Sequence, residues 1–288
     1  MTATWLHGVL IVALPLGVAS QTVSIPAIAD TGLREVFATE PGGSETGFRV
    51  GNTSSTGADS RNRALVRFDV AGAVPAGAQI TDVSLRLTVS RTIDTNSREL
   101  ELRRVLVSWD ESQATWIQRA DAISWTAPGG MEGADFSSIV SAATTVGGLG
   151  TYVWGSTPGM VGDARRWQSN ALENFGWMLL INPEGVAGTA RRFYSRESVI
   201  DPAMLDITYK PPFRIDSAEV SGTNFCITFT ATLGRSYVVE RRDDVAKGNW
   251  LVLTNLPTAK VTGPVTVCDT FGALRRYYRV GESKTPRQ

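Results

Sequence analysis

Histidine is almost absent from this sequence of 288 residues, since the one histidine, His7, lies in an apolar N-terminal stretch. The rest of the chain therefore cannot build a Ser-His-Asp or Cys-His nucleophile system, and it lacks the commonest side chain of zinc and iron sites. These absences argue against hydrolases of the triad type and against zinc enzymes.

Cysteine is also scarce, with Cys226 and Cys268 as the only two. In the segments NFCITFT and GPVTVCD, each cysteine falls out of phase with the alternating apolar residues. We therefore expect both sulfur atoms to leave the apolar face and to bridge neighbouring strands. One disulfide is the predicted state of such a pair in an exported chain, and two buried free thiols are the alternative.

Lysine is missing between residues 21 and 209, so every cation there is an arginine. Over the whole chain 28 basic residues balance 28 acidic ones, and no basic run exceeds two residues. This pattern excludes nucleic acid as an expected partner. The fork of an arginine suits carboxylates, including those of uronic-acid sugars, although an arginine-rich surface without a ligand is the simpler interpretation.

Long apolar runs are missing after residue 20, so we expect no membrane anchor in the mature chain. The run from Val9 to Val18 has the length of a signal-peptide core and is followed by the small residues Ala19 and Ser20. We predict a signal peptide over residues 1–20, a polar tail over residues 283–288, and a secreted, periplasmic or cell-surface protein.

Short alternating segments separated by Gly, Pro, Asn and Ser fill most of the chain and predict an all-β protein. In QITDVSLRLTVS, for example, apolar and polar residues alternate, and a phase slip at Arg103–Arg104 predicts a bulge. The prolines of KPPF, residues 210–213, indicate a linker. We therefore predict a jelly-roll-like β-sandwich at 22–210 and a smaller immunoglobulin/fibronectin-like β-sandwich at 213–282.

One helix is expected, in the segment TPGMVGDARRWQSN at residues 157–170. Pro158 suits the first turn, and Met160, Ala164 and Trp167 share one face. We expect this helix to lie across one end of the first sandwich, with Trp167 packed inside.

Several motifs together carry a resemblance to a known family. In ADTGLREVF the residues Asp30, Leu33, Arg34 and Glu35 match a motif of six positions. Further motifs follow in order: RALVRFDVAGAVPAGAQITDVSLRL, WDESQATW, AISWTAPGGMEGADF, NFGWMLL and RRFYSRES. From Asp30 to Tyr209 this ordered set resembles the DNRLRE domain, a module of secreted proteins that is also classed with carbohydrate-binding modules of family 96.

The resemblance implies a non-catalytic jelly-roll module that binds carbohydrate, with acidic polysaccharide such as alginate bound by some members. The second domain, with its segments YVVE and YYRV, resembles C-terminal strand modules of exported bacterial proteins. That second resemblance implies no activity.

The candidate carbohydrate-binding residues are aromatic or cationic. Trp116 and Trp125 lie in polar, loop-like sequence, where exposed rings could stack against sugars. In the strand-like segment RRFYSRES, the side chains of Arg192, Tyr194 and Arg196 share one face and could form a groove for sugar carboxylates. The alternative for RRFYSRES is an arginine–glutamate clasp that closes the sandwich.

The residues expected to form this clasp are Asp30, Arg34, Glu35 and Glu197. We expect Arg34 or Glu35 to pair with Arg196 or Glu197, because the first and last strands of such folds often lie close together.

Catalysis is not expected. A glycosidase would need two opposed carboxylates, and no spacing in the sequence places any two of Asp110, Glu111, Glu184 and Glu197 opposite each other. A lyase using Tyr194 and Arg191 is the other chemical option. We predict no cofactor and no metal site, and calcium lacks the support of a dense Asp-x-Asp-x-Asp loop.

The sequence thus favours a secreted, non-catalytic protein that binds an acidic or cell-wall polysaccharide. The alternative is a structural or adhesive cell-surface protein with no glycan ligand. Burial of all six tryptophans between residues 109 and 177, together with the lack of a groove with exposed aromatic residues, would favour this alternative.

Overall fold

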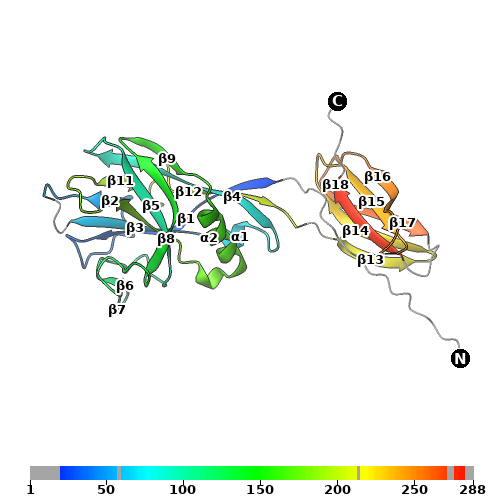
Figure 1. Cartoon of the computed structure of the whole chain (residues 1–288), viewed down its shortest axis with the longest axis horizontal. Helices are drawn as coiled ribbons and strands as arrows, with labels where there is room; N and C mark the ends of the chain where they lie inside the picture. The colour runs from blue at the N-terminus through cyan, green and yellow to red at the C-terminus, as the bar shows by residue number, and fades with distance from the viewer. Residues whose placement is uncertain (1–19, 57–59, 213–214, 245, 271–275, 283–288) are drawn as a thin grey trace. The chain divides into compact units, whose positions relative to one another are not determined.

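The computed structural model of the chain describes residues 20–56, 60–212, 215–244, 246–270 and 276–282. These residues divide into two compact units, residues 20–210 and the residues from 211 onward. Each unit is built mainly from strands (Figure 1), so the predicted all-β class is confirmed. The predicted signal peptide at 1–20, except Ser20, and the polar tail at 283–288 lie outside the described residues.

The elements of the first domain follow one another in a simple order. They are β1 (Gln21–Arg34), β2 (Gly47–Asn52), β3 (Arg61–Phe68), α1 (Val70–Ala73), β4 (Gln79–Thr92), β5 (Arg98–Val105), β6 (Gln118–Ala120), β7 (Ile123–Ser124), β8 (Phe136–Val146), β9 (Gly150–Trp154), α2 (Pro158–Ser169), the 3₁₀ helix η1 (Ala171–Glu173), β10 (Trp177–Asn182), β11 (Arg191–Tyr194) and β12 (Met204–Lys210).

The long strands of this domain form two antiparallel layers. One layer joins β1, β12, β4, β9, β11 and β2. The other joins β1, β3, β10, β5 and β8. Strand β1 serves both layers: residues 21–26 pair with β12, and beyond an irregularity between Ala27 and Ala29 the strand pairs with β3. The arrangement is that of a β-sandwich, as the sequence predicted.

The core between the layers follows from alternation along the strands. In β4 the side chains of Val83, Leu85, Leu87 and Val89 are buried in the main cluster. Strand β10 is apolar on both sides because an apolar cluster lies on each side of it. Trp177, Leu179 and Ile181 enter the main cluster. Met178 and Leu180 enter a second cluster beneath the loops. The positions that point outward from the sheets are left for polar side chains.

Helix α2 begins and ends where the sequence predicted. The Thr157 hydroxyl accepts a hydrogen bond from the backbone N–H of Met160, and Asn170 ends the helix. Met160, Ala164 and Trp167 are buried, and the helix packs against β4 and β8, one strand from each layer. The ring of Trp167 lies 4.5 Å from that of Trp177, centroid to centroid. Packing of this face holds a helix too short to be stable alone.

The bulge predicted near Arg103–Arg104 is confirmed, because the register between β5 and β8 shifts on both sides of Arg103. The additional residues belong to β8, because β5 keeps an unbroken register with β10. Arg103 and Arg104 have different partners because consecutive residues of a strand face opposite sides: Arg103 pairs with Glu101 at 2.7 Å, and Arg104 pairs with Asp163 at 2.9 Å.

The second domain consists of two small sheets. Its strands are β13 (Ile215–Ser221), β14 (Asn224–Ala231), β15 (Tyr237–Arg242), β16 (Leu251–Leu256), β17 (Gly263–Thr270) and β18 (Tyr277–Glu282). Strands β13, β14 and β17 form one sheet, and β16, β15 and β18 form the other. Cys226 and Cys268 face each other across β14 and β17 and form the predicted disulfide.

No helix in the described part of either domain has the length and apolar character needed to cross a membrane.

Candidate functional site

Three arginines form a row across the outer face of the first domain. Arg192 of β11 lies opposite Arg49 of β2 on one side and opposite Arg91 of β4 on the other. Arg49 alternates with the buried Phe48 and Val50, which turns its side chain away from the core. Alternation places Arg49 and Arg192 on this face, and a register shift in β4 just before Arg91 brings that residue to the same face. The row also depends on the order in which the three strands pair.

This arginine row (Arg49, Arg192 and Arg91) has no carboxylate partner among the described residues. Most other arginines of the domain are paired with Asp or Glu. Like charges that face each other across strands destabilise a sheet. A run of three unpaired cations is thus an unfavourable surface for the protein alone and a favourable one for an anionic ligand.

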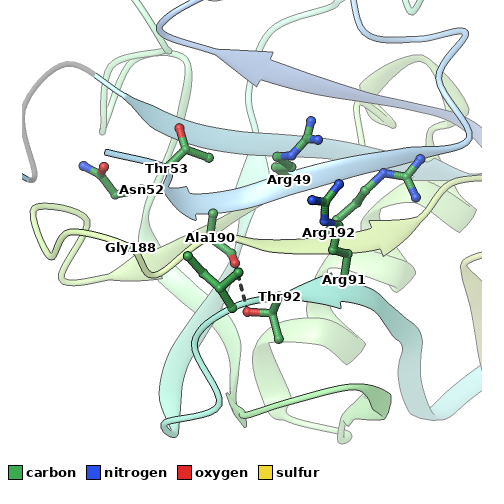
Figure 2. Close-up of a pocket in the computed structure, with 9 residues that line it drawn as sticks. Arg49, Asn52, Thr53, Arg91, Thr92, Gly188, Ala190 and Arg192 are labelled. Carbon is green, nitrogen blue, oxygen red and sulfur yellow. Dashed lines mark hydrogen bonds between the residues drawn. The ribbon is translucent and has the colours of Figure 1, made fainter. Parts of the chain in front are cut away.

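The row borders a surface pocket of about 210 Å³. Figure 2 shows the three arginines grouped along one side of this pocket, with Asn52, Thr53 and Gly188 toward the other side. The remaining lining residues are Thr92, Ile93 and Ala190. Thr92 donates a hydrogen bond through Oγ1 to the carbonyl of Ala190 at 3.1 Å, which joins β4 to the chain that leads into β11. The pocket offers cations, an amide and hydroxyls but no tryptophan.

Arg191 supports the pocket from below. Its side chain is fully buried, and its guanidinium donates to the carbonyls of Thr189, Asn96 and Gly147 and to Asp94. Burial alone would raise the pKa of Asp94, but hydrogen bonds from Arg98 and Asn96 and the charge of Arg191 outweigh it and lower that pKa to about 2. A buried ion pair with satisfied hydrogen bonds thus fixes the loops around the pocket.

Neutralising a flanking arginine should relieve the repulsion within the row. We expect Arg91→Gln to raise the unfolding free energy by about 0.5 kcal/mol, with a larger gain at low salt than at high salt. Thermal unfolding of the full chain at two ionic strengths measures this effect. Arg86→Gln is the matched control, because it removes an exposed arginine of the same strand that is paired with Asp206 at 3.5 Å. An equal gain in the control would contradict the argument.

A second charged cluster surrounds Asp30, which is 2% exposed. Asp30 accepts a hydrogen bond from the backbone N–H of Arg196 at 2.7 Å, and its own N–H donates to Glu111 at 2.7 Å. Burial raises the pKa of Asp30 to about 7, and the charges of Glu197 and Glu111 add to the increase against the hydrogen bond from Arg196. The proton of this carboxyl group therefore leaves near neutral pH.

The cluster is also a set of potential metal ligands. Carboxylate oxygens of Asp30, Glu111 and Glu197 lie within 4.8 Å of one another. The guanidinium of Arg196 already contacts two of these carboxylates, Glu111 at 2.6 and 2.7 Å and Glu197 at 3.0 Å. The positive charge of Arg196 thus compensates these carboxylates in the way that a bound metal ion would.

The prediction that Trp116 and Trp125 form a sugar platform is corrected by their burial. They are 2% and 4% exposed, and both belong to the cluster beneath the loops. The ring of Trp116 packs against Gly129, where a Cβ would approach within 2.6 Å, and lies under the guanidinium groups of Arg61 and Arg63. All six tryptophans between residues 109 and 177 are buried.

The RRFYSRES segment divides between two roles. Arg192 and Tyr194 are half-buried and lie on the same side of β11, which agrees with the predicted shared face. Arg196 lies beyond the end of the strand, and its guanidinium is held by Glu111 and Glu197. Of the three predicted groove residues, Arg192 is part of the arginine row and Tyr194 lies on the same side of β11. Arg196 belongs to the charged cluster around Asp30.

The predicted pairing of Arg34 or Glu35 with Arg196 or Glu197 is wrong. Arg34 donates to Glu45 at 2.6 Å, and Glu35 accepts from the backbone and side chain of Arg61 at 2.9 and 3.0 Å. The reason is register: the end of β1 lies opposite the start of β3, whereas the clasp forms four residues earlier, at Asp30. Asp30 and Glu197 do lie together, as predicted.

The residues considered for catalysis have structural partners. Glu184 binds Arg63 at 2.6 Å, Glu111 binds Arg196, and Asp110 accepts from the backbone N–H of Ser112 at 2.9 Å. Arg191, the suggested lyase partner of Tyr194, is fully buried and cannot reach a substrate. Asp135, the aspartate of the motif AISWTAPGGMEGADF, accepts hydrogen bonds from Thr126 and Met131 and is also buried.

Arg49 and Arg91 were not among the residues predicted from the sequence. Alternation with its buried neighbours in β2 indicates that Arg49 points outward. Arg91 is in phase with the buried Leu87 and Val89 of β4 and turns outward because of the bulge at Ser90. Alternation does not indicate that their strands flank β11, because β2, β4 and β11 are far apart in the chain.

Comparison with known families and proteins adds one finding. The model of Carbohydrate-binding module family 96 matches residues 21–127, a range that contains β2 and β4 with Arg49 and Arg91. Comparison of the chain with curated proteins yields no match.

Proposed function

We propose that the first domain, in which residues 21–127 match the model of Carbohydrate-binding module family 96, binds an acidic polysaccharide without transforming it. The observation that carries the proposal is the row of Arg49, Arg192 and Arg91, which has no carboxylate partner within the described residues. Guanidinium groups bind carboxylates with two parallel hydrogen bonds. Uronic-acid residues of a polysaccharide are ligands of this kind.

The location of the row supports the same proposal. It lies on an open sheet face beside a shallow pocket, which leaves room for a chain to lie across several strands. Neighbouring strands are about 4.8 Å apart, a spacing comparable to the length of one sugar residue. Tyr194 on the same side of β11 offers a half-exposed ring beside the row.

We also propose that the protein is secreted and works outside the cytoplasm. The disulfide between Cys226 and Cys268 supports this proposal, because structural disulfides persist in oxidising compartments. The apolar stretch at the N-terminus gives a second argument from the sequence.

Substitution of the whole row tests the function. We expect the full chain to bind a polyuronate such as alginate in an affinity gel. The variant Arg49→Gln, Arg91→Gln, Arg192→Gln should bind more than about 1000-fold more weakly, since it loses three charged contacts of roughly 1.5 kcal/mol each. Added salt should weaken the wild-type complex. The matched control is Arg86→Gln with Arg166→Gln, which removes two exposed, ion-paired arginines of the same domain.

A structural or adhesive role without a glycan ligand is the second candidate. The burial of all six tryptophans between residues 109 and 177 favours it, because the domain then lacks the usual stacking platform for neutral sugars. Failure of the wild-type chain to bind any polyanionic or neutral glycan would decide for this second candidate.

A further inference from the structure

The three arginines of the row differ in how firmly they are held. The guanidinium of Arg192 donates from Nη1 to the hydroxyl of Ser90 at 3.1 Å and from Nη2 to the hydroxyl of Thr46 at 2.9 Å. Ser90 belongs to β4 and Thr46 immediately precedes β2, so both neighbours of β11 take part. Among the described residues, the side chains of Arg49 and Arg91 have no hydrogen-bond partner, so only the guanidinium of Arg192 is held in one orientation.

The hydroxyl of Ser90 is itself fixed. It donates its own hydrogen to the backbone carbonyl of Arg192 at 3.1 Å, which leaves its lone pairs free to accept from the guanidinium. Ser90 is the extra residue at the point where the register of β4 and β11 shifts. Alternation with the buried Val89 already directs the Ser90 hydroxyl to the face of Arg192, and the bulge adds Arg91 to the same face.

Gly47 provides the space beneath the guanidinium. A Cβ atom at this position would lie 2.6 Å from Cζ and 2.7 Å from Nη1 of Arg192, and 2.3 Å from the carbonyl oxygen of Phe193. Any side chain here would displace the arginine. Gly47, Ser90 and Thr46 together therefore form a seat for the guanidinium of Arg192.

A seated arginine still has donors to offer. A guanidinium carries five N–H groups, and the two hydroxyls use two of them. The remaining three are enough for a bidentate contact with one carboxylate. Because this side chain is already ordered, it loses less conformational entropy on binding than the two free arginines beside it.

From this geometry we infer that Arg192 determines the specificity of the row: it binds one ligand carboxylate through two N–H groups, while Arg49 and Arg91 attract neighbouring charges. Ser90 and Thr46 are positioning residues for Arg192. The inference rests on the proposed function and assigns different binding roles to the three arginines of the same site.

Lysine substitutions separate geometry from charge. Each of Arg49→Lys, Arg91→Lys and Arg192→Lys keeps the positive charge but removes the planar fork. We expect Arg192→Lys to weaken binding of the full chain to alginate about tenfold, and the other two to weaken it less than about threefold. All three variants should keep the salt dependence of the wild type, because the number of charges is unchanged.

The positioning role has its own test at an exposed residue. Thr46→Val should weaken binding by about threefold, and Thr46→Ser, which restores the hydroxyl, should recover the wild-type affinity. Equal losses for the three lysine variants, together with the loss of binding in the glutamine variant of the whole row, would overturn the inference and leave the proposed function standing. No binding of alginate by the wild-type chain would overturn both.

Discussion

Replacement of Asp30 by asparagine should stabilise the first domain at pH 8 and leave it unchanged at pH 4. The buried carboxyl group has a pKa of about 7 in the folded protein and an ordinary value of 3.8. Between these two values the folded state holds a proton that the unfolded state has released, so the stability of the wild type falls as pH rises from about 4 to about 7. The amide of the variant stays neutral throughout, so the unfolding free energy of the variant does not show this decrease with pH.

The expected difference at pH 8 is roughly 4 kcal/mol, since the pKa rises from 3.8 to about 7 and each unit corresponds to about 1.4 kcal/mol. An asparagine oxygen can still accept the hydrogen bond from the backbone of Arg196. Urea unfolding of both proteins across this pH range measures the difference. Asp121→Asn, at an exposed position of the same domain, is the control. A flat profile for Asp30→Asn would refute the prediction.

Removal of the disulfide should have an effect of similar size on the second domain. The bridge closes a loop with a sequence separation of 42 residues. In the chain-entropy model, Cys226→Ser with Cys268→Ser lowers the unfolding free energy by about 4 kcal/mol. The apolar cluster of this small domain leaves little stability in reserve. Calorimetry of the full chain should therefore show one transition at a much lower temperature and the transition of the first domain unchanged.

The neighbouring cross-strand pair Thr228 and Thr266 provides the control for the disulfide. These residues lie on the same two strands, two positions along, and their hydroxyls are 2.8 Å apart. Replacing both by valine removes a cross-strand contact without opening a loop, and we expect a change below about 1 kcal/mol. A comparable loss in both double variants would mean that packing of these strands, rather than loop closure, explains the result.

The features that the sequence predicted well depend on local periodicity. The spacing of Met160, Ala164 and Trp167 identified both the helix and its buried face. The phase of Cys226 and Cys268 against their apolar neighbours placed both sulfur atoms on one side of a sheet, where they meet. In each case neighbouring residues along the chain were sufficient, because helices and strands repeat over a few residues.

Loops have no such period, and there the sequence misled. Trp116 and Trp125 stand in polar sequence, but the loops fold over a second apolar cluster that draws on β1, β3 and β10. The arginine row was missed for a related reason. The outward positions of Arg49 and Arg192 follow from their own strands, but that of Arg91 depends on the bulge in β4. The row exists only because β2, β11 and β4 become neighbours.

The order of strands in the first domain has a consequence for how the protein is made. Across the sheets the order is β1, β12, β4, β11, β2, β3, β10, β5 and β8, so β4 lies between two strands that come from the last quarter of the domain, and β3 and β5 pair with β10. During synthesis β3, β4 and β5 emerge long before the strands that cover their edges. The nascent chain exposes the unpaired backbone groups and apolar faces of these strands, and it must remain soluble until about residue 210 has been made. Folding of this domain is therefore a late and slow event, dominated by pairings between distant parts of the chain.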